Sequence, residues 1–452
     1  MKINNSFPDD NLKSEGKINP INIQRDKPII NNSKKKKIWI ILIIILFIIF
    51  IIILIPLIIV KFVKNAKYKS LIKLNNIKFP SSKGNNLYKE GHLNSYYNFS
   101  YNMFLNANYS NFSPISLYNI LINVYLAISD NNASKILNDI LGLNHDERIL
   151  FYDQILNNNH FKNSEGEIKI SNSAFYNSDK AKENKSYIEQ ISKTYTECYK
   201  LSFETDFNFI IDWINKALKE EKNELGDNFK DKENIAILLI SSLYYKQKWK
   251  IKFDSYDTFK DIFYIDNNNK KEVYFMKHSY EVDNYYDYEK YISFYDYYSN
   301  DYLIQYIIPK SINDNILELI CNINFLYENE SFNKKGTYIY LSVPKFKIDN
   351  EIDFVPILEK IGLEKLFDEN YGILNNPFII EDISYYLNKL FQKNIIELNE
   401  DGTTVKSVTY GEIIPMSWEY GLEVKLNRPF IYTIRDINKL PIFIGYIQEP
   451  NN

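Results

Sequence analysis

Fourteen residues near the C-terminus, Thr403–Met416, constrain the fold of this chain more than any other stretch. Side chains alternate between the two faces of a strand, so as a strand this stretch would have one uncharged face. That face would carry Thr403, Val405, Ser407, Thr409, Gly411 and Ile413. However, the turn sequences Glu400-Asp401-Gly402 and Pro415-Met416-Ser417 lie at its two ends. We interpret the stretch either as an edge strand that runs into a turn or as a segment that switches between exposed loop and buried strand.

The overall charge and composition argue against nucleic acid as a partner. The 452 residues carry a net charge of −3 with a pI of about 6.0, and the lysines are scattered rather than gathered on one predicted helix face. Tyrosine (38) and phenylalanine (29) are abundant, and Asn, Ile and Lys are common throughout. We interpret this as a compositional bias, so no single Asn, Lys or Tyr cluster is given functional weight.

The chain lacks the usual sequence signatures of metal sites and of catalysis. Its two cysteines, Cys198 and Cys321, exclude a disulfide framework and leave either one bridge or two free thiols. None of the four histidines stands in a metal-binding spacing, and there is no nucleophile elbow, phosphate-binding glycine loop or dinucleotide fingerprint. We therefore expect no metal, no cofactor and no enzymatic activity.

One long apolar run predicts a membrane segment. Ile38–Val60 contains 23 residues without a charge. At a rise of about 1.5 Å per residue, such a helix spans a hydrocarbon core of about 30 Å. The run is longer than the apolar part of a secretory signal, and no small-residue cleavage site follows it. We predict an uncleaved signal anchor in the lipid bilayer; the alternative, a buried core helix, is rarely so long or so apolar.

Positive charges flank this run on both sides, and their distribution bears on its orientation. Six Lys or Arg residues lie within twenty residues of either end, but the compact Lys34–Lys37 block directly before the run favours an N-terminus on the inner side. We therefore expect a single-pass membrane protein with its folded part in a lumen or outside the cell. Asn-x-Ser sequons permit that location and give candidate N-glycosylation sites. They include Asn98, Asn108, Asn184 and Asn329.

The remainder of the chain is predicted to form one large folded unit behind a short stalk. We expect a disordered polar tail over 1–37, the membrane span over 38–60, a stalk over 61–90 and the folded unit over 91–452. Within the unit, no composition shift, long linker or internal repeat marks a further boundary.

Helices are predicted early in this unit and strands later, which favours the α+β class. Ser113-Pro114 and Ser134 are typical helix starts within 95–160, and the stretch from Asp206 to about Leu225 has helical spacing, as does Ile352–Phe367. Strand-like runs follow at Ile235–Tyr245, Thr337–Pro344, Tyr385–Glu400, Leu422–Tyr432 and Pro441–Gln448.

Several motifs, in order along the chain, resemble the serpin family. The resemblance is highly specific because so many weak matches fall in the family's order, and it covers about 90–452. The matching stretches are Asn111–Ser116, Ile240–Trp249, Leu341–Ile348, Ile361–Asp368, Leu398–Thr403, Arg428–Phe430 and Phe443–Pro450.

The resemblance implies the serpin fold, with three β-sheets, eight or nine helices and an exposed reactive loop near the C-terminus. It also implies that a target protease cleaves the loop, forms a covalent acyl-enzyme and is trapped when the loop enters the main sheet. Counting from Gly402 places Met416 before the cleaved bond and Ser417 after it. Since Met fits apolar pockets, we expect an elastase- or chymotrypsin-like serine protease as partner. The implied hinge residues are Glu400, Gly402, Thr403, Val405, Ser407 and Thr409.

The family also has a buried polar network that controls opening of the main sheet. The corresponding residues here are Ser113, Ser116, Ser241, Gln392 and Trp249. Ser241 stands where an Asn is usual, Gln392 where a His is usual, and Gln247 where a Gly is usual. The sequence therefore leaves two hypotheses: a monomeric, membrane-anchored protease inhibitor, or a non-inhibitory serpin fold acting as chaperone, carrier or surface interaction module.

Overall fold

The computed structural model describes residue 39 and residues 42–52, 54–55, 68–219, 232–379, 385–403 and 421–451. The chain divides into two compact units, Met1–Lys67 and Tyr68–Asn452. In the first unit, residues 42–52 are helical and carry mostly exposed apolar side chains. Within the described ranges, no helix has the length and apolar character to cross a membrane. The expected tail over 1–37 and part of the expected span over 38–60 lie outside these ranges.

The helices of the second unit lie mainly in its first half. Ser113 caps α3 as predicted, since its Oγ accepts a hydrogen bond from Ser116 N at 3.5 Å. Ser134 starts no helix, because Asp130 caps α4 first through a bond from Ala133 N at 2.8 Å. The helices are α2 (Glu90–Asn106), α3 (Pro114–Ala127), α4 (Asn131–Leu141), α5 (His145–Asn159), α6 (Lys185–Ser192), α7 (Asn208–Leu218), α8 (Ile316–Ile320) and α9 (Val355–Leu358), with a short π and 3-10 stretch over Glu359–Leu366.

The largest sheet has the strand order β1-β4-β3-β5-β14-β13-β12, and β2 pairs with β3. Its strands are β1 (Ile72–Lys73), β2 (Phe161–Lys162), β3 (Gly166–Asn177), β4 (Thr196–Leu201), β5 (Ile237–Lys248), β12 (Phe346–Asp353), β13 (Phe391–Asn399) and β14 (Gly402–Thr403). Segments that are far apart in the sequence thus become neighbours in one sheet.

Two smaller sheets complete the unit. The five-stranded sheet contains, in spatial order, β17 (Pro441–Ile447), β16 (Phe430–Arg435), β10 (Leu303–Pro309), β9 (Tyr291–Tyr297) and β8 (Tyr285–Asp287). The four-stranded sheet contains β15 (Leu422–Lys425), β11 (Thr337–Pro344), β7 (Lys270–Val282) and β6 (Phe259–Tyr264). The predicted strand Leu422–Tyr432 is therefore two strands in two sheets, separated by residues 426–429.

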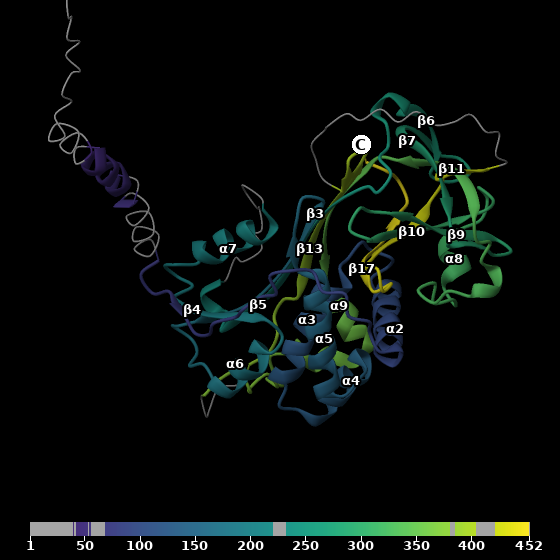
Figure 1. Cartoon of the computed structure of the whole chain (residues 1–452). Helices are drawn as coiled ribbons and strands as arrows, with labels where there is room; N and C mark the ends of the chain where they lie inside the picture. The colour runs from purple at the N-terminus through teal and green to yellow at the C-terminus, as the bar shows by residue number, and fades with distance from the viewer. Residues whose placement is uncertain are drawn as a thin grey trace, which may run out of the picture. The chain divides into compact units, whose positions relative to one another are not determined.

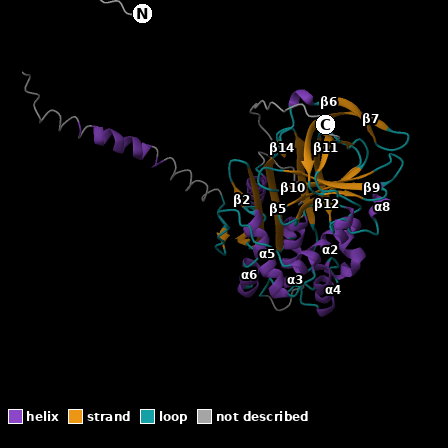
Figure 2. Ribbon diagram, turned by 45° about the vertical axis from the view of Figure 1, so that its right-hand side comes forward, coloured by secondary structure: helices purple, strands orange, loops and turns teal. Residues whose placement is uncertain are grey.

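Most helices of the second unit gather at one end, while α7 packs on β3 and β5 and α8 contacts β10, and the strands form separate sheets; this confirms the α+β class. Figure 2 shows α2 to α6 gathered below the strands, and Figure 1 shows β6, β7 and β11 at the far end from α4. The helix α3 lies in the centre, with Leu117 and Leu121 among its fully buried side chains, and contacts β5 and β17. A continuous apolar core thus joins the helical layer to the large and five-stranded sheets.

Part of the expected stalk belongs to the folded unit. Ile72 and Lys73 form an edge strand on β4, Phe79 stacks on His160 at a centroid distance of 4.8 Å, and Gly84 N donates to Asn157 O at 2.7 Å. The compact unit begins at Tyr68 rather than at residue 91. Hydrogen bonds to other elements and the packing of Leu71, Leu74 and Phe79 against the core hold this segment, and these scattered apolar residues show no periodic pattern in the sequence.

Replacement of Ser70 by alanine tests whether this segment stabilises the unit. Ser70 N donates to buried Asp206 at 2.7 Å, and Ser70 Oγ accepts from Ser202 N at 2.8 Å. Ser70→Ala removes the acceptor for Ser202, so we expect the free energy of unfolding to fall by about 1–3 kcal/mol in urea denaturation. The exposed Ser81→Ala serves as the control. Equal stability of the two variants would contradict the role of the segment.

Candidate functional site

The candidate site is a gap in the large sheet between β5 and β13. Among the residues described, backbone pairing across it is made by the two residues of β14: Gly402 lies between Lys248 and Asn399, and Thr403 between Gln247 and Leu398. Beyond these pairs, no backbone pairing joins β5 to β13 within the described part of the chain. Two strands of one sheet therefore face each other with backbone edges that are not paired to each other beyond β14.

Cavities continue this gap away from β14. One of about 40 Å³ lies beneath α7, between residues 238–242 of β5 and residues 389–393. A larger cavity of about 480 Å³ lies where β5 begins, and its lining is mainly apolar. It is bounded by α3, residues 234–239 and residues 385–390. Empty volume in a protein interior forgoes packing contacts, so these cavities mark places where an inserted segment would gain contacts.

Trp249 joins the two strands at the β14 end of the gap. Its Nε1 donates to Asn399 O at 2.8 Å, and its ring stacks on Tyr298 at a centroid distance of 4.5 Å. The side chain is 1% exposed. Because Trp249 follows β5 and Asn399 ends β13, this bond fixes the entrance of the gap while leaving the rest unbridged.

The turn that leads into β14 is held by an ion pair. Both carboxylate oxygens of Glu400 lie 2.9–3.0 Å from Lys345 Nζ, and Thr258 Oγ1 donates to Glu400 at 2.8 Å. Burial alone would raise the pKa of Glu400, but the hydrogen bonds from Lys345 and Thr258 outweigh it and lower the pKa. The carboxylate is thus kept charged and paired at neutral pH.

Glycine is required at position 402. Its φ is +128°, and a Cβ there would lie 2.1 Å from Gln247 O. This close approach, with a positive φ that glycine adopts readily, lets the chain turn from β13 into the gap beside β5.

Gln392 connects β13 to the start of α3. Ser113 N donates to Gln392 Oε1 at 2.7 Å, and Gln392 Nε2 donates to Ser113 O at 3.1 Å. All of these atoms are buried. Ser116 lies one turn further along α3, where its own Oγ has no partner among the residues described. The structure thus brings Ser113, Ser116 and Gln392 together at one place.

Ser241 makes its contact elsewhere. Its Oγ donates to Asn172 Oδ1 of β3 at 2.7 Å, and Asn172 Nδ2 in turn donates to Tyr152 Oη at 3.0 Å. Asn394 of β13 similarly donates to Asn111 O at 2.9 Å. These asparagines were missed because the Asn-rich composition hides them, and β3 itself carries other polar residues, such as Ser171 and Ser173, that give Asn172 no distinguishing signal.

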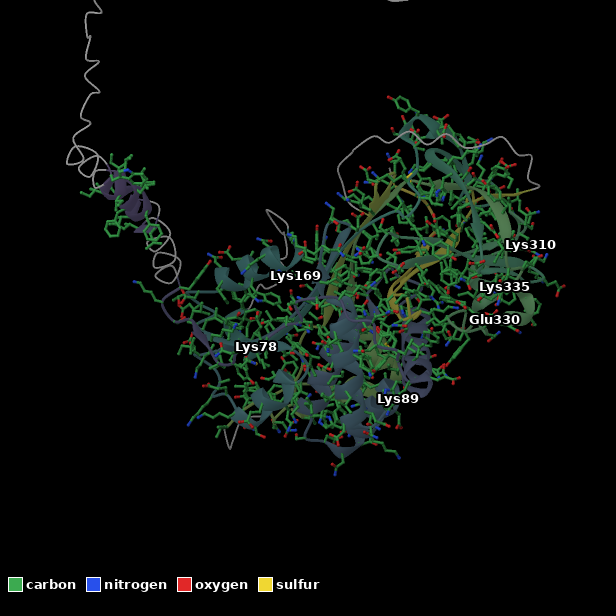
Figure 3. The ribbon with its side chains drawn as sticks, in the orientation of Figure 1. Lys78, Lys89, Lys169, Lys310, Glu330 and Lys335 are labelled. Atoms are coloured by element: carbon green, nitrogen blue, oxygen red, sulfur yellow. The ribbon has the colours of Figure 1, made fainter. Side chains whose placement is uncertain are left out.

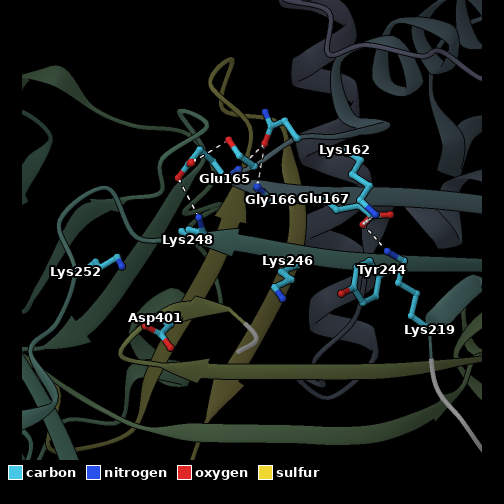
Figure 4. A pocket seen from close by; sticks show the side chains of 12 residues that line it. Lys162, Glu165, Gly166, Glu167, Lys219, Tyr244, Lys246, Lys248, Lys252 and Asp401 are labelled. Atoms are coloured by element: carbon cyan, nitrogen blue, oxygen red, sulfur yellow. Dashed lines mark hydrogen bonds and ion pairs between the residues drawn. The ribbon is translucent and has the colours of Figure 1, made fainter. Parts of the chain in front are cut away.

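The bulky Gln247 is accommodated by a glycine on the neighbouring strand. A Cβ on Gly166 would lie 2.5 Å from Gln247 Oε1, which also accepts from Asn300 Nδ2 at 2.7 Å. Figure 4 looks into an adjoining pocket of about 380 Å³, where Lys248 lies 3.6 Å from Glu165. Gln247 therefore fits beside the entrance of the gap without displacing β3.

The predicted cleavage site lies outside the described residues. This applies to Met416 and Ser417 and to the hinge residues Val405, Ser407 and Thr409. The hinge residues within the described ranges are Glu400, Gly402 and, for its backbone, Thr403. The structure therefore describes where the loop leaves the sheet and, from Gly421, where it returns.

The candidate glycosylation sites differ in accessibility. Asn98, Asn108 and Asn329 are exposed, whereas Asn184 Nδ2 donates to Asn376 O at 2.8 Å.

Charged side chains are spread over separate parts of the second unit, as the labels of Lys78, Lys89 and Lys310 in Figure 3 show.

The chemistry of the cysteines is limited by their positions. Both are free, Cys321 is exposed, and burial raises the pKa of Cys198 to about 12. The described residues contain no group of three or more His, Cys, Asp or Glu side chains that could hold a metal ion.

Comparisons with known proteins agree with this geometry. Residues 94–450 match the family described as Serpin (serine protease inhibitor). Alpha-1-antiproteinase 2 of Equus caballus is 25% identical over 272 residues, which are 58% of this chain and 62% of the horse protein. The chain therefore spans less than two thirds of that relative.

Solved structures show the same fold. The native state of Tengpin, a thermophilic serpin, has a TM-score of 0.72 at 23% identity and covers 84% of this chain and 100% of its own. Human thyroxine-binding globulin, solved with its hormone, has a TM-score of 0.64 at 19% identity and covers 80% of this chain and 99% of its own. The serpin fold expected from the sequence is confirmed.

A substitution at Gln392 tests the contact between β13 and α3. Gln392→Ala would leave the buried N–H of Ser113 without an acceptor, while Ser113 O keeps its bond from Leu117 N. We therefore expect the free energy of unfolding to fall by about 1–3 kcal/mol. Gln392→His keeps a donor and an acceptor and should lose less. The exposed Gln448→Ala is the control in the same urea titration. An alanine variant as stable as the control would show that the contact between Gln392 and Ser113 does not stabilise the protein.

Proposed function

We propose that this chain, which belongs to the serpin family, is a membrane-anchored suicide-substrate inhibitor of an elastase- or chymotrypsin-like serine protease. The supporting observation is β14, which occupies the first two positions of a gap that continues between β5 and β13. In the proposed reaction the protease serine attacks the carbonyl carbon of Met416. An ester bond to the protease forms, the peptide bond to Ser417 breaks, and the new amino terminus of Ser417 takes the proton.

The register of β14 indicates how the freed loop would enter the gap. Gly402 pairs with Lys248 and Thr403 with Gln247, so continuing the antiparallel register would pair Thr404–Ile413 with residues 246–237 of β5. The residue pairs face alternately inward and outward. Val405 would lie opposite Tyr245, whose ring is buried against Tyr298 and Phe443.

This register places the small side chains of the loop inward. Ser407 would lie opposite Leu243 and Thr409 opposite Ser241, on the same face as Tyr245. Lys406 would face outward, opposite the half-buried Tyr244. The uncharged face recognised in the sequence is therefore the one that the core can accept.

The energetic gain from insertion is large. A new strand would form backbone hydrogen bonds with both β5 and β13, each worth about 0.5–1.5 kcal/mol net. A strand of this length would stabilise the cleaved chain by on the order of 10 kcal/mol. Since about 1.4 kcal/mol corresponds to a tenfold equilibrium shift, insertion would in practice be irreversible.

We propose residues 38–60 as the membrane anchor, with the N-terminus on the inner side and the folded unit in a lumen or outside the cell. The support is the exposed apolar surface of residues 42–52, which needs an apolar partner. Only residues 61–67 separate this run from Tyr68, so a fully extended linker reaches about 25 Å. Retention of the protein in membranes after alkaline washing tests the anchor, and loss of mass on enzymatic deglycosylation tests the location of the sequons.

Exchanging two adjacent loop residues tests insertion at constant composition. The double variant Lys406→Ser, Ser407→Lys moves an ammonium group from the outward to the inward face, where burial opposes it. We expect at least a tenfold lower yield of the covalent complex with chymotrypsin or elastase on denaturing gels, with cleavage of the loop retained. Lys406→Ser alone is the control and should form the complex.

The outcome also separates inhibition from the alternative hypothesis. Cleavage of the unmodified protein without any covalent complex would favour a non-inhibitory role such as carrier or chaperone. Equal complex yields for the double variant and its control would contradict the proposed register.

Oxidation of Met416 tests the position of the cleaved bond. The sulfoxide is polar and should fit an apolar protease pocket poorly, so we expect complex formation to slow at least tenfold. Met416→Leu should resist the oxidant and retain its rate, which controls for damage elsewhere. N-terminal sequencing of the cleaved chain should begin at Ser417; a new terminus several residues away would refute the assignment.

A further inference from the structure

In the four-stranded sheet, β15 begins only a few residues after the proposed cleaved bond. Gly421 is four residues after Ser417, a reach of at most about 14 Å, and β15 follows at once. A protease domain of about 230 residues has a radius of gyration near 17 Å. A protease that holds the bond between Met416 and Ser417 must therefore extend beyond Gly421 and come close to this sheet.

Two tyrosines of this sheet contact Gly421, the first described residue after the loop. Tyr338 and Tyr340 project from β11 on the side away from the core, because Ile339 and Leu341 between them are fully buried. A Cβ on Gly421 would lie 2.5 Å from Tyr340 Cε2 and 2.9 Å from Tyr338 Cδ1. The backbone of the returning loop thus lies directly against both rings, which stand edge to face 5.5 Å apart.

Two carboxylates flank these rings. Glu281 of β7 is directly opposite Tyr338, and Glu423 of β15 is directly opposite Tyr340. Directly opposed residues point to the same face of a sheet, and both glutamates are exposed. Neither has an ion-pair partner within the described ranges, whereas Ser279 Oγ lies 3.0 Å from Tyr338 Oη and fixes that ring.

The other charges on this sheet are mostly compensated. Lys260 pairs with Glu272 at 3.3 Å, and Lys425 pairs with Asp261. Lys277 is exposed on the same face of β7, opposite Ser342, and adds one positive charge beside the tyrosine pair. The tyrosine pair with its two glutamates is therefore an aromatic surface on which negative charge exceeds positive charge by one.

We propose that Tyr338, Tyr340, Glu281 and Glu423 form a secondary docking surface for a basic surface segment of the attacking protease. This proposal rests on the inhibitory function proposed above. A guanidinium group can stack on a tyrosine ring and pair with an adjacent carboxylate, and tyrosine and arginine dominate binding hot spots. The surface would raise the rate of encounter and select among proteases that share a preference for Met416.

The test measures two quantities: the rate constant for formation of the covalent complex, and the number of inhibitor molecules consumed per protease. The full chain in detergent would carry Tyr340→Ala together with Glu281→Gln and Glu423→Gln. We expect the second-order rate constant for covalent complex formation with chymotrypsin or elastase to fall about tenfold, with a weaker dependence on salt. The number of inhibitor molecules consumed per protease should stay unchanged, because the residues proposed to insert and the strands on either side of the gap are not substituted.

A matched control changes the same residue types elsewhere. Tyr371→Ala with Glu369→Gln alters exposed side chains near the connection between α3 and α4, and should leave the rate unchanged. Equal rates for the triple variant and this control, in folded proteins of equal thermal midpoint, would overturn the docking surface alone. Absence of a covalent complex with the unmodified chain would instead overturn the inhibitory function on which the surface depends.

Discussion

The contact on which the rest of the structure depends is the two-residue strand β14 between β5 and β13. Gly402 and Thr403 satisfy backbone groups of both neighbours at the entrance of the gap, and the remaining edges of the two strands face each other without pairing among the residues described. Unpaired strand edges are unstable in proteins and are usually covered or blunted. Here they set both the direction and the register in which a freed loop would add to the sheet.

The surrounding contacts divide into those that fix the entrance and those that hold the flanking strands. Trp249 ties the two strands together at the entrance through Asn399, and the pair of Glu400 with Lys345 shapes the turn. Further along, Gln392 attaches β13 to α3, while Ser241 attaches β5 to β3. The last two contacts attach β13 to α3 and β5 to β3, so neither of them bridges the gap between β5 and β13.

Much of this arrangement could be predicted from residues whose role is local. The Ser113 cap, the β11 strand and the turn at Glu400-Asp401-Gly402 follow from capping, alternation and turn residues. The resemblance of several motifs then supplied the fold. What could not be predicted were partners chosen by tertiary packing: Ser241 bonds to Asn172 rather than to Gln392, and Gly166 makes room for Gln247. Residues 68–89 were also missed as part of the folded unit, because hydrogen bonds and a few scattered apolar contacts, without a periodic pattern, hold them.

Hydrogen exchange measured before and after loop cleavage tests the central claim most directly. If the edges of β5 and β13 gain a strand between them, amides in residues 238–246 and 391–398 should exchange much more slowly in the cleaved chain than in the intact chain. Unchanged exchange in both segments, in a chain shown by sequencing to be cut after Met416, would contradict the account.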